Sequence, residues 1–275
     1  MQITILTENY AAESDLAEWG FSALIEHNGQ RLLFDTGYTG QCLLKNAQQL
    51  KISLEQLDAI VLSHGHNDHT GGLDHLLQNT TCRKIYAHPQ VFMQRFSRGE
   101  DGELEDISFP HSQNYYEQKY GAQFLFSRSW QEILPDIFMT GEVAMQNHYE
   151  QLATNLLVKN GQGELEQDQF PDDNSLVVRM KQGMVIVFGC AHRGIVNIMQ
   201  HCKEQLDIPI YAIVGGMHLY RATEEHYLFV REFLQNNTVK QICPGHCTGM
   251  QRIFDLQNSF PQQVEPAFCG HRLCL

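Results

Sequence analysis

The sequence has no long uninterrupted hydrophobic run. None of its apolar stretches approaches the roughly 20 residues that a membrane-spanning helix requires. Residues 1–4 open on an alternation of apolar and polar side chains, without the basic and hydrophobic regions of a secretory signal. The sequence therefore predicts a cytoplasmic protein with no membrane partner.

Positive charge is also scarce. The chain has 19 Lys and Arg against 32 Asp and Glu, which gives a net charge of -13. Such a charge repels phosphate backbones and anionic lipid headgroups, and no local basic patch offsets it. These features predict that the partner is a small molecule and that nucleic acid is not bound.

Internal repeats, Gly/Ser-rich linkers and shifts in composition are missing, which predicts a single domain over residues 1–275. The eight cysteines occur in a long chain without an export signal, so we expect reduced thiols rather than a disulfide framework. The unusual feature is the number of histidines, 14, because many imidazoles favour metal chemistry.

Strand-like and helix-like patterns alternate along most of the chain. Residues 21–25 and 31–34 flank the turn sequence His27-Asn28-Gly29 and predict a hairpin, as do the β-branched runs around Lys181-Gln182-Gly183. From about residue 89 to 150 the pattern weakens, which we interpret as an insertion or lid. Further strands are expected at residues 3–6, 59–62, 84–87, 156–158, 208–214 and 239–243, and helices at 43–50, 195–206 and 224–234.

The most informative stretch follows the strand ending at Leu62. It reads Ser63-His64-Gly65-His66-Asn67-Asp68-His69, with further glycines at 71 and 72. His64 and His66 are two positions apart, so in extended backbone both point the same way and can bind one ion. Asp68 and His69 turn into the next helix and point to a neighbouring place. This geometry suits two metal ions, and the flanking glycines make a packing role a poor explanation.

His-x-His-x-Asp-His after a strand is the signature of the metallo-β-lactamase superfamily, which this sequence resembles. Asp35, in Phe34-Asp35-Thr36-Gly37, resembles the upstream Asp motif of that family and is expected to orient the metal-binding loop. The resemblance implies an α/β fold. Its form is a four-layer αβ/βα sandwich in which helices cover the outer sides of two sheets and the metals lie at one edge.

Three later motifs resemble a narrower subgroup, that of an archaeal synthase which joins a dihydropterin to a ribofuranosyl-aminobenzene phosphate. They are Gly189-Cys190-Ala191-His192-Arg193, Gly215-Gly216-Met217-His218 and Gly245-His246-Cys247. Cys190 stands where the family usually has a bridging aspartate. Asp172 and Asp173 lie near the place of a third-motif histidine in other members.

The resemblance implies two divalent metal ions, with zinc favoured and iron or manganese as alternatives. Whether Cys190 is a thiolate ligand or a packing residue, and whether Cys190 or Asp173 completes the site, stays open. The expected metal ligands are His64, His66, Asp68, His69, Cys190, His192 and His246.

Two residues are expected to contact the substrate. His218 follows a buried strand and is a candidate substrate contact or proton donor, with a capping or core role as the alternative. Arg193 precedes a helix that starts after Gly194, so a cation and free backbone N–H groups would meet there and suit a phosphate or carboxylate. A solvated arginine is the alternative. The substrate is therefore expected to be anionic.

The leading hypothesis is a metal-dependent hydrolase. A metal-activated hydroxide would attack an ester, lactone or phosphoester, and Asp68 would hold or receive the proton. The subgroup resemblance gives an alternative, a synthase that condenses a dihydropterin with an aryl ribose phosphate. A non-catalytic metal-binding or ligand-binding protein is a third hypothesis, and a homodimer is left open.

Overall fold

The computed structural model describes residues 1–11 and 15–275, and the chain divides into two compact units. Unit 1 comprises Met1–Ser127, Leu152–Asp172 and Phe268–Leu275, and unit 2 comprises Arg128–Gln151 and Asp173–Ala267. Each unit is therefore built from segments that are distant in the sequence. The expected single domain with an insertion stays a prediction.

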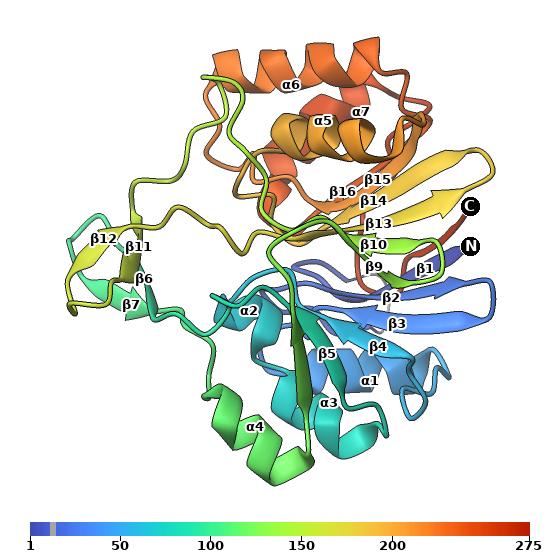
Figure 1. Cartoon of the computed structure of the whole chain (residues 1–275). Helices are drawn as coiled ribbons and strands as arrows, with labels where there is room; N and C mark the ends of the chain where they lie inside the picture. The colour runs from blue at the N-terminus through green and yellow to red at the C-terminus, as the bar shows by residue number, and fades with distance from the viewer. Residues whose placement is uncertain (12–14) are drawn as a thin grey trace. The chain divides into compact units, whose positions relative to one another are not determined.

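Unit 1 contains a seven-stranded sheet (Figure 1). The strands from β17 to β3 pair antiparallel, whereas those from β3 to β8 pair parallel. The parallel half matters for function, because the carboxyl ends of its strands lie at one edge. In order across the sheet, the strands are β17 (Arg272–Cys274), β1 (Gln2–Thr7), β2 (Ser22–His27), β3 (Gln30–Phe34), β4 (Ala59–Val61), β5 (Lys84–Ala87) and β8 (Gln123–Phe126).

Helices cover one face of this sheet. Buried leucines of the helices, such as Leu43 and Leu76, share a hydrophobic cluster with Leu33 of β3 and Ile60 of β4. This burial of apolar side chains fixes the helices on the parallel strands. The helices of unit 1 are α1 (Gln41–Gln49), α2 (Asn67–Thr70), α3 (Leu73–Asn79) and α4 (Gln113–Tyr120).

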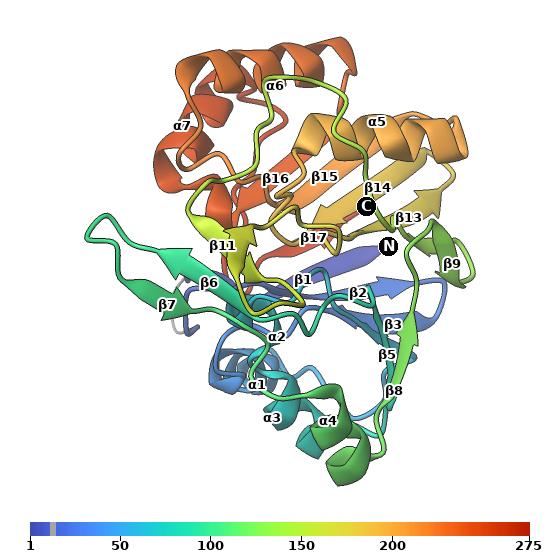
Figure 2. The same cartoon turned by 60° about the vertical axis from the view of Figure 1, so that its left-hand side comes forward.

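A second, smaller sheet belongs to unit 1 and is visible in Figure 2. All of its strand pairs are antiparallel. Its four strands are β12 (Leu165–Gln167), β11 (Leu156–Lys159), β6 (Arg95–Arg98) and β7 (Leu104–Asp106).

Unit 2 is a six-stranded sheet with helices α5 (Ile195–Leu206), α6 (Glu224–Asn236) and α7 (Met250–Ser259), which Figure 1 shows on one side of it. Strands β14, β15 and β16 pair parallel, so their carboxyl ends also share an edge. In order, the strands are β16 (Gln241–Gly245), β15 (Ile210–Gly216), β14 (Gly183–Phe188), β13 (Ser175–Met180), β10 (Ile137–Met139) and β9 (Gln131–Leu134).

Many local predictions are confirmed. The β2–β3 turn has Asn28 at φ 50 and Gly29 at φ 79, the left-handed pair that a two-residue hairpin loop requires. Helix α5 spans the predicted residues 195–206. The expected insertion, residues 89–150, contributes strands to three different sheets: β6 and β7 to the small one, β8 to the seven-stranded one, and β9 and β10 to the six-stranded one.

No helix in the described part of the chain is both long enough and apolar enough to cross a membrane.

Replacing Ile60 by alanine tests the core of unit 1. Ile60 is fully buried, so we expect the cavity to lower the free energy of unfolding by about 2–5 kcal/mol, measured by urea denaturation. Leu104→Ala is the control, because Leu104 is 44% exposed and its loss should change stability by at most about 0.5 kcal/mol. Equal effects of the two substitutions would contradict the burial of Ile60 in the core of unit 1.

Candidate functional site

The four predicted ligands after β4 lie together in unit 1. The ring centroids of His64 and His66 are 4.5 Å apart, and those of His64 and His69 are 4.2 Å apart. His69 Nε2 lies 3.6 Å from Asp68 Oδ2. Helix α2 begins after His66, so the first two imidazoles come from extended chain and the other two ligands from the helix. The expected change of direction within the motif is confirmed.

Asp35 fixes the orientation of this group. It follows β3, the parallel neighbour of β4, and is fully buried. Its carboxylate accepts from Ser63 N and Ser63 Oγ, both at 2.7 Å, and from His69 Nδ1 at 2.7 Å. Because a carboxylate can only accept here, His69 donates through Nδ1 and carries its lone pair on Nε2.

The Ser63 hydroxyl extends this control to His64. Its hydrogen is donated to Asp35, so its oxygen accepts at the 2.9 Å contact with His64 Nδ1. His64 therefore also carries its lone pair on Nε2. Imidazoles that present the Nε2 lone pair, together with a carboxylate, are a ligand set suited to zinc and to other divalent transition metals. The donor chemistry of unit 1 thus fits a divalent metal ion.

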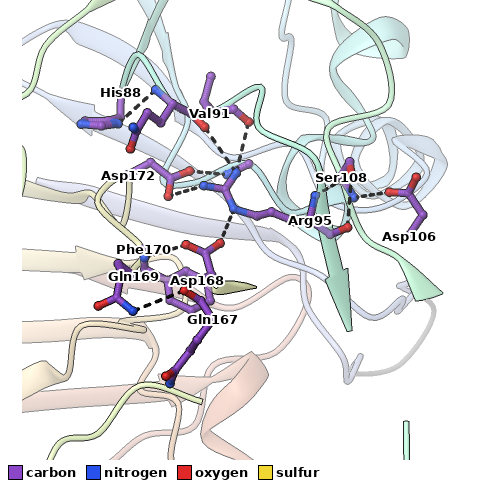
Figure 3. Close-up of polar contacts among 12 residues, drawn as sticks. His88, Val91, Arg95, Asp106, Ser108, Gln167, Asp168, Gln169, Phe170 and Asp172 are labelled. Atoms are coloured by element: carbon purple, nitrogen blue, oxygen red, sulfur yellow. Dashed lines mark hydrogen bonds and ion pairs between the residues drawn. The ribbon is translucent and has the colours of Figure 1, made fainter. Parts of the chain in front are cut away.

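A buried arginine, which no sequence pattern had indicated, bonds to two carboxylates, one of which contacts the motif (Figure 3). Arg95 of β6 is fully buried and its guanidinium bonds to Asp168 Oδ2 and Asp172 Oδ1, both at 2.7 Å. The second oxygen of Asp172 accepts from Gly65 N at 3.0 Å, between the first two histidines. A Cβ at position 65 would collide with Val91 O and with the guanidinium, so glycine is required there.

The charges of this network are coupled. Burial raises the pKa of Asp172 to about 6, and the neighbouring Arg95 opposes that rise. Burial would lower the pKa of Arg95, but the two carboxylates outweigh the effect of burial and raise that pKa.

The His66 ring also packs edge-on against Phe170, with ring centroids 5.6 Å apart. The loop that carries His64 and His66 is thus held by hydrogen bonds and by an aromatic contact.

In unit 2, a second group of potential metal ligands lies at the carboxyl ends of the parallel strands. Cys190 follows β14, His218 follows β15, and Cys247 follows β16. Their potential ligand atoms all lie within 4.8 Å of one another. Cys247 Sγ also donates to Cys190 O at 3.3 Å. Cys190 therefore lies next to His218 and Cys247. Cys247 was not among the predicted site residues.

The remaining predicted residues of unit 2 lie at the same strand ends. The His192 and His218 rings have centroids 4.4 Å apart, and His246 is buried directly after β16. Ala191, His218 and His246 have φ values of 56, 50 and 48, a left-handed conformation that costs free energy in residues other than glycine. Such strain is concentrated at functional sites in proteins, and here it occurs at three adjacent strand ends.

The thiol of Cys247 is chemically unusual. Burial alone would raise its pKa, but the side chains of Cys190 and His218, through hydrogen bonds to the sulfur, outweigh burial and hold the pKa well below its ordinary value. The signal that sequence analysis missed is positional: Cys247 is the next residue after His246, at the end of a parallel strand.

The expectation of free N–H groups at the start of α5 is wrong. Val196 N and Asn197 N donate to the carboxylate of Glu150 at 2.8 and 2.9 Å. Glu150 is 2% exposed, and burial raises its pKa although these hydrogen bonds oppose the rise. The protein itself therefore supplies the anion at this helix terminus. The sequence gave no sign of this contact, because Glu150 lies 46 positions before Val196.

Arg193 is partly committed to protein contacts. Its backbone N donates to Asp173 Oδ2 and its Nε to Val143 O, both at 2.8 Å. Burial lowers the pKa of Arg193, and the carboxylates of Asp173 and Glu142 oppose the decrease. Asp173 thus binds the backbone beside the predicted ligand His192. The role of Arg193 in binding an anionic substrate stays a prediction.

Comparison with known proteins identifies the family. Residues 20–147 match the family model of the metallo-beta-lactamase superfamily. A Methanocaldococcus jannaschii protein, 7,8-dihydropterin-6-methyl-4-(beta-D-ribofuranosyl)-aminobenzene-5'-phosphate synthase, is 32% identical over 287 residues, which cover 98% of this chain and 93% of the relative. The chain belongs to the metallo-beta-lactamase superfamily. The resemblance drawn from His64, His66, Asp68 and His69 is confirmed.

Solved structures share the fold of this chain. The chain is 28% identical to Tm1679, described as a metal-dependent hydrolase of the beta-lactamase superfamily, with a TM-score of 0.85 over 100% of this chain and 99% of the other. The metallo-beta-lactamase fold protein YhfI from Bacillus subtilis is 14% identical with a TM-score of 0.60, covering 99% of each chain. The predicted α/β fold class is therefore confirmed.

Removing the Ser63 hydroxyl tests the control of the histidine tautomers. Ser63→Ala breaks the link from Asp35 to His64, so we expect zinc affinity to fall by about 10-fold or more, measured by competition with a chromophoric chelator. Ser22→Ala is the control, because the Ser22 hydroxyl donates to the backbone O of Asp35 at 2.8 Å and does not contact the imidazoles. Unchanged affinity in Ser63→Ala would show that Asp35 and Ser63 do not set the ring orientation.

A second test compares substitutions of the two aspartates that bind Arg95. Asp172→Asn weakens the acceptor for Gly65 N, whereas Asp168→Asn leaves that bond in place. We expect Asp172→Asn to lower zinc affinity by about 10-fold and Asp168→Asn to have a smaller effect, in the same chelator competition. If both variants lose affinity equally, the bond to Gly65 is not what positions the loop.

Proposed function

We propose that this chain is a metal-dependent hydrolase whose substrate is a small ester, lactone or phosphoester. The observation that supports the proposal most strongly is the group formed by His64, His66, Asp68 and His69, with Nε2 lone pairs set through Asp35 and Ser63. The whole group is buried, and that burial limits competition from bulk water for the ligands.

The resident cofactor in this proposal is two divalent metal ions, zinc being favoured over iron or manganese. Bound to these donors, such ions would supply Lewis-acid activation of water and of the substrate carbonyl or phosphoryl group. Cys190, His192 and His246 of unit 2 are proposed as further ligands. The imidazoles and thiol of this set are ligand types that zinc binds.

The protein side chains then move protons and hold the substrate. We assign the carboxylate of Asp68, a residue that is 9% exposed, to accept the proton of the attacking water. His218 is assigned to donate a proton to the leaving group, and Arg193 to contact an anionic part of the substrate. The leaving group thus departs protonated, and the enzyme returns to its starting state once a proton passes from Asp68 to solvent and His218 is reprotonated.

Location and partners also belong to the proposal. All eight cysteines are free thiols in the structure, which supports a reducing, cytoplasmic setting. The net charge of -13 supports a small-molecule partner and argues against nucleic acid. The oligomeric state, with a homodimer as one possibility, is to be measured by size-exclusion chromatography with light scattering.

A second candidate function is a pterin-related synthase. The specific observation in its favour is the 32% identity to the Methanocaldococcus jannaschii synthase over nearly the whole of both chains. In this reading the metal held by the same ligands, together with His218, would activate the electrophile, and Arg193 would hold the phosphate. A non-catalytic metal-binding or ligand-binding protein is the third candidate.

Removing one histidine tests the hydrolase proposal. For the unaltered chain we expect about two zinc ions by elemental analysis and turnover on a panel of esters, lactones and phosphoesters. His66→Ala should lose metal and at least about 100-fold of the activity, because a direct ligand contributes at least as much as an outer partner. His75→Ala is the control, since His75 is exposed on α3.

The outcomes separate the three candidates. Full metal content in His66→Ala would refute the assigned ligands. A metal-loaded chain that hydrolyses nothing in the panel but yields the condensed product of a dihydropterin and an aryl ribose phosphate, by mass spectrometry, would favour the synthase. A metal-loaded chain with neither activity would favour the non-catalytic metal-binding protein, and a chain that binds no metal after reconstitution would favour the non-catalytic ligand-binding protein.

A further inference from the structure

A cavity of about 610 Å³ lies in unit 1 directly beside the predicted metal ligands. Asn67, which lies between His66 and Asp68 in the sequence, forms part of its wall. The volume falls in the range of about 300–1,000 Å³ that small-molecule sites occupy. A ligand in this cavity would contact the chain one residue away from two predicted metal ligands.

The apolar wall of the cavity is aromatic. Tyr38, Phe92, Phe109 and His111 all line it. Phe92 and Phe109 support each other, with ring centroids 4.5 Å apart, and Tyr38 is 47% exposed and presents a ring that a ligand could cover. Aromatic side chains favour stacking against flat rings.

The polar residues of the lining favour a hydrogen-bond donor over an anion. They include Asp106, Asn67 and Gln94, and among the described residues that line the cavity there is no Lys or Arg. A carboxylate accepts hydrogen bonds but repels phosphate and carboxylate groups. The cavity is therefore suited to a neutral ring that carries N–H groups and is unsuited to the anionic part of a substrate.

Backbone contacts hold the cavity wall against the metal-binding motif. Asn67 N donates to Ile107 O at 2.9 Å, and Asn67 Nδ2 approaches Asp106 O at 3.4 Å. On the other side, a Cβ at Gly71 would collide with Tyr38 O, so the turn after α2 packs directly on the Tyr38 backbone. Asp106 Oδ1 is oriented in turn by Ser108 N at 2.9 Å.

We propose that this cavity, the ring subsite formed by Tyr38, Asn67, Phe92, Asp106, Phe109 and His111, binds a planar nitrogen-heteroaromatic ring of the substrate, with Asp106 accepting the N–H groups of a ring amino edge. The inference rests on the proposed function and specifies its substrate class. It assigns the ring to unit 1 beside α2, while any anionic group of the substrate binds elsewhere.

Paired ligands that differ in one amino group test this subsite. The probes are 2-amino-4-oxopteridine against 2,4-dioxopteridine, and guanosine against inosine, each titrated calorimetrically into the chain after incubation with zinc. A charge-assisted hydrogen bond of about 1.5–3 kcal/mol corresponds to about 10-fold or more in affinity. We expect the amino-bearing member of at least one pair to bind about 10-fold more tightly, and the pair that shows the preference identifies the ring system.

Three variants separate the parts of the subsite. Asp106→Asn should reduce the preference for the amino group to about twofold or less, because an amide is a weaker acceptor than a carboxylate. Asp101→Asn is the control, an exposed aspartate between β6 and β7 that does not line the cavity, and it should keep the preference. Tyr38→Ala should weaken both members of a pair by the same factor, about 10-fold, through lost stacking.

Equal affinity for both members of each pair, a preference that persists in Asp106→Asn, or no binding of any probe would overturn the ring subsite. Zinc content and turnover are measured on the same samples. If these are normal while ring binding fails, the subsite is wrong and the hydrolase proposal stands. If zinc binding and turnover fail while the amino preference is found, the subsite stands and the hydrolase proposal is wrong.

Discussion

The orientation of the predicted metal ligands in unit 1 depends on one carboxylate. Asp35 accepts two hydrogen bonds from Ser63 and one from His69, and those bonds fix which nitrogen of two imidazoles carries the lone pair. The arrangement exists because β3 and β4 are parallel neighbours, so the residues that follow them meet at one edge. Asp35 adopts a φ of 58 to reach this position, a cost that the three hydrogen bonds offset.

The buried guanidinium of Arg95 has a different role. Moving a cation and two carboxylates out of water is expensive, so a buried ion-pair network of this kind contributes little net stability. It does fix geometry, because each group must keep its partners to avoid an uncompensated buried charge. Through Asp172 and Gly65, this requirement connects β6 of the small sheet with the loop that carries His64 and His66.

The sequence predicted the buried elements and missed the exposed ones. Strands such as β4 and β14 are fully buried and read as continuous apolar runs, and the α5 helix has a regular apolar stripe. Strands β7 and β12 were missed because all of their residues are exposed, so they have no hydrophobic alternation to detect. Their pairing in the small sheet is a tertiary fact. The Glu150 contact at the start of α5 was missed for the same reason, since a long-range hydrogen bond leaves no periodic trace.

The sequence by itself determined the family, the α/β class and the local geometry of the predicted metal ligands, because these depend on local spacing: two histidines in extended chain, then Asp68 and His69 in the first turn of a helix. Only the tertiary structure decided how Ser63 and Asp35 orient the imidazoles, that Arg95 and Asp172 support the loop, and that Cys247 joins Cys190 and His218. Each of these contacts joins residues from different elements. Such contacts are set by strand order and packing, which local spacing does not encode.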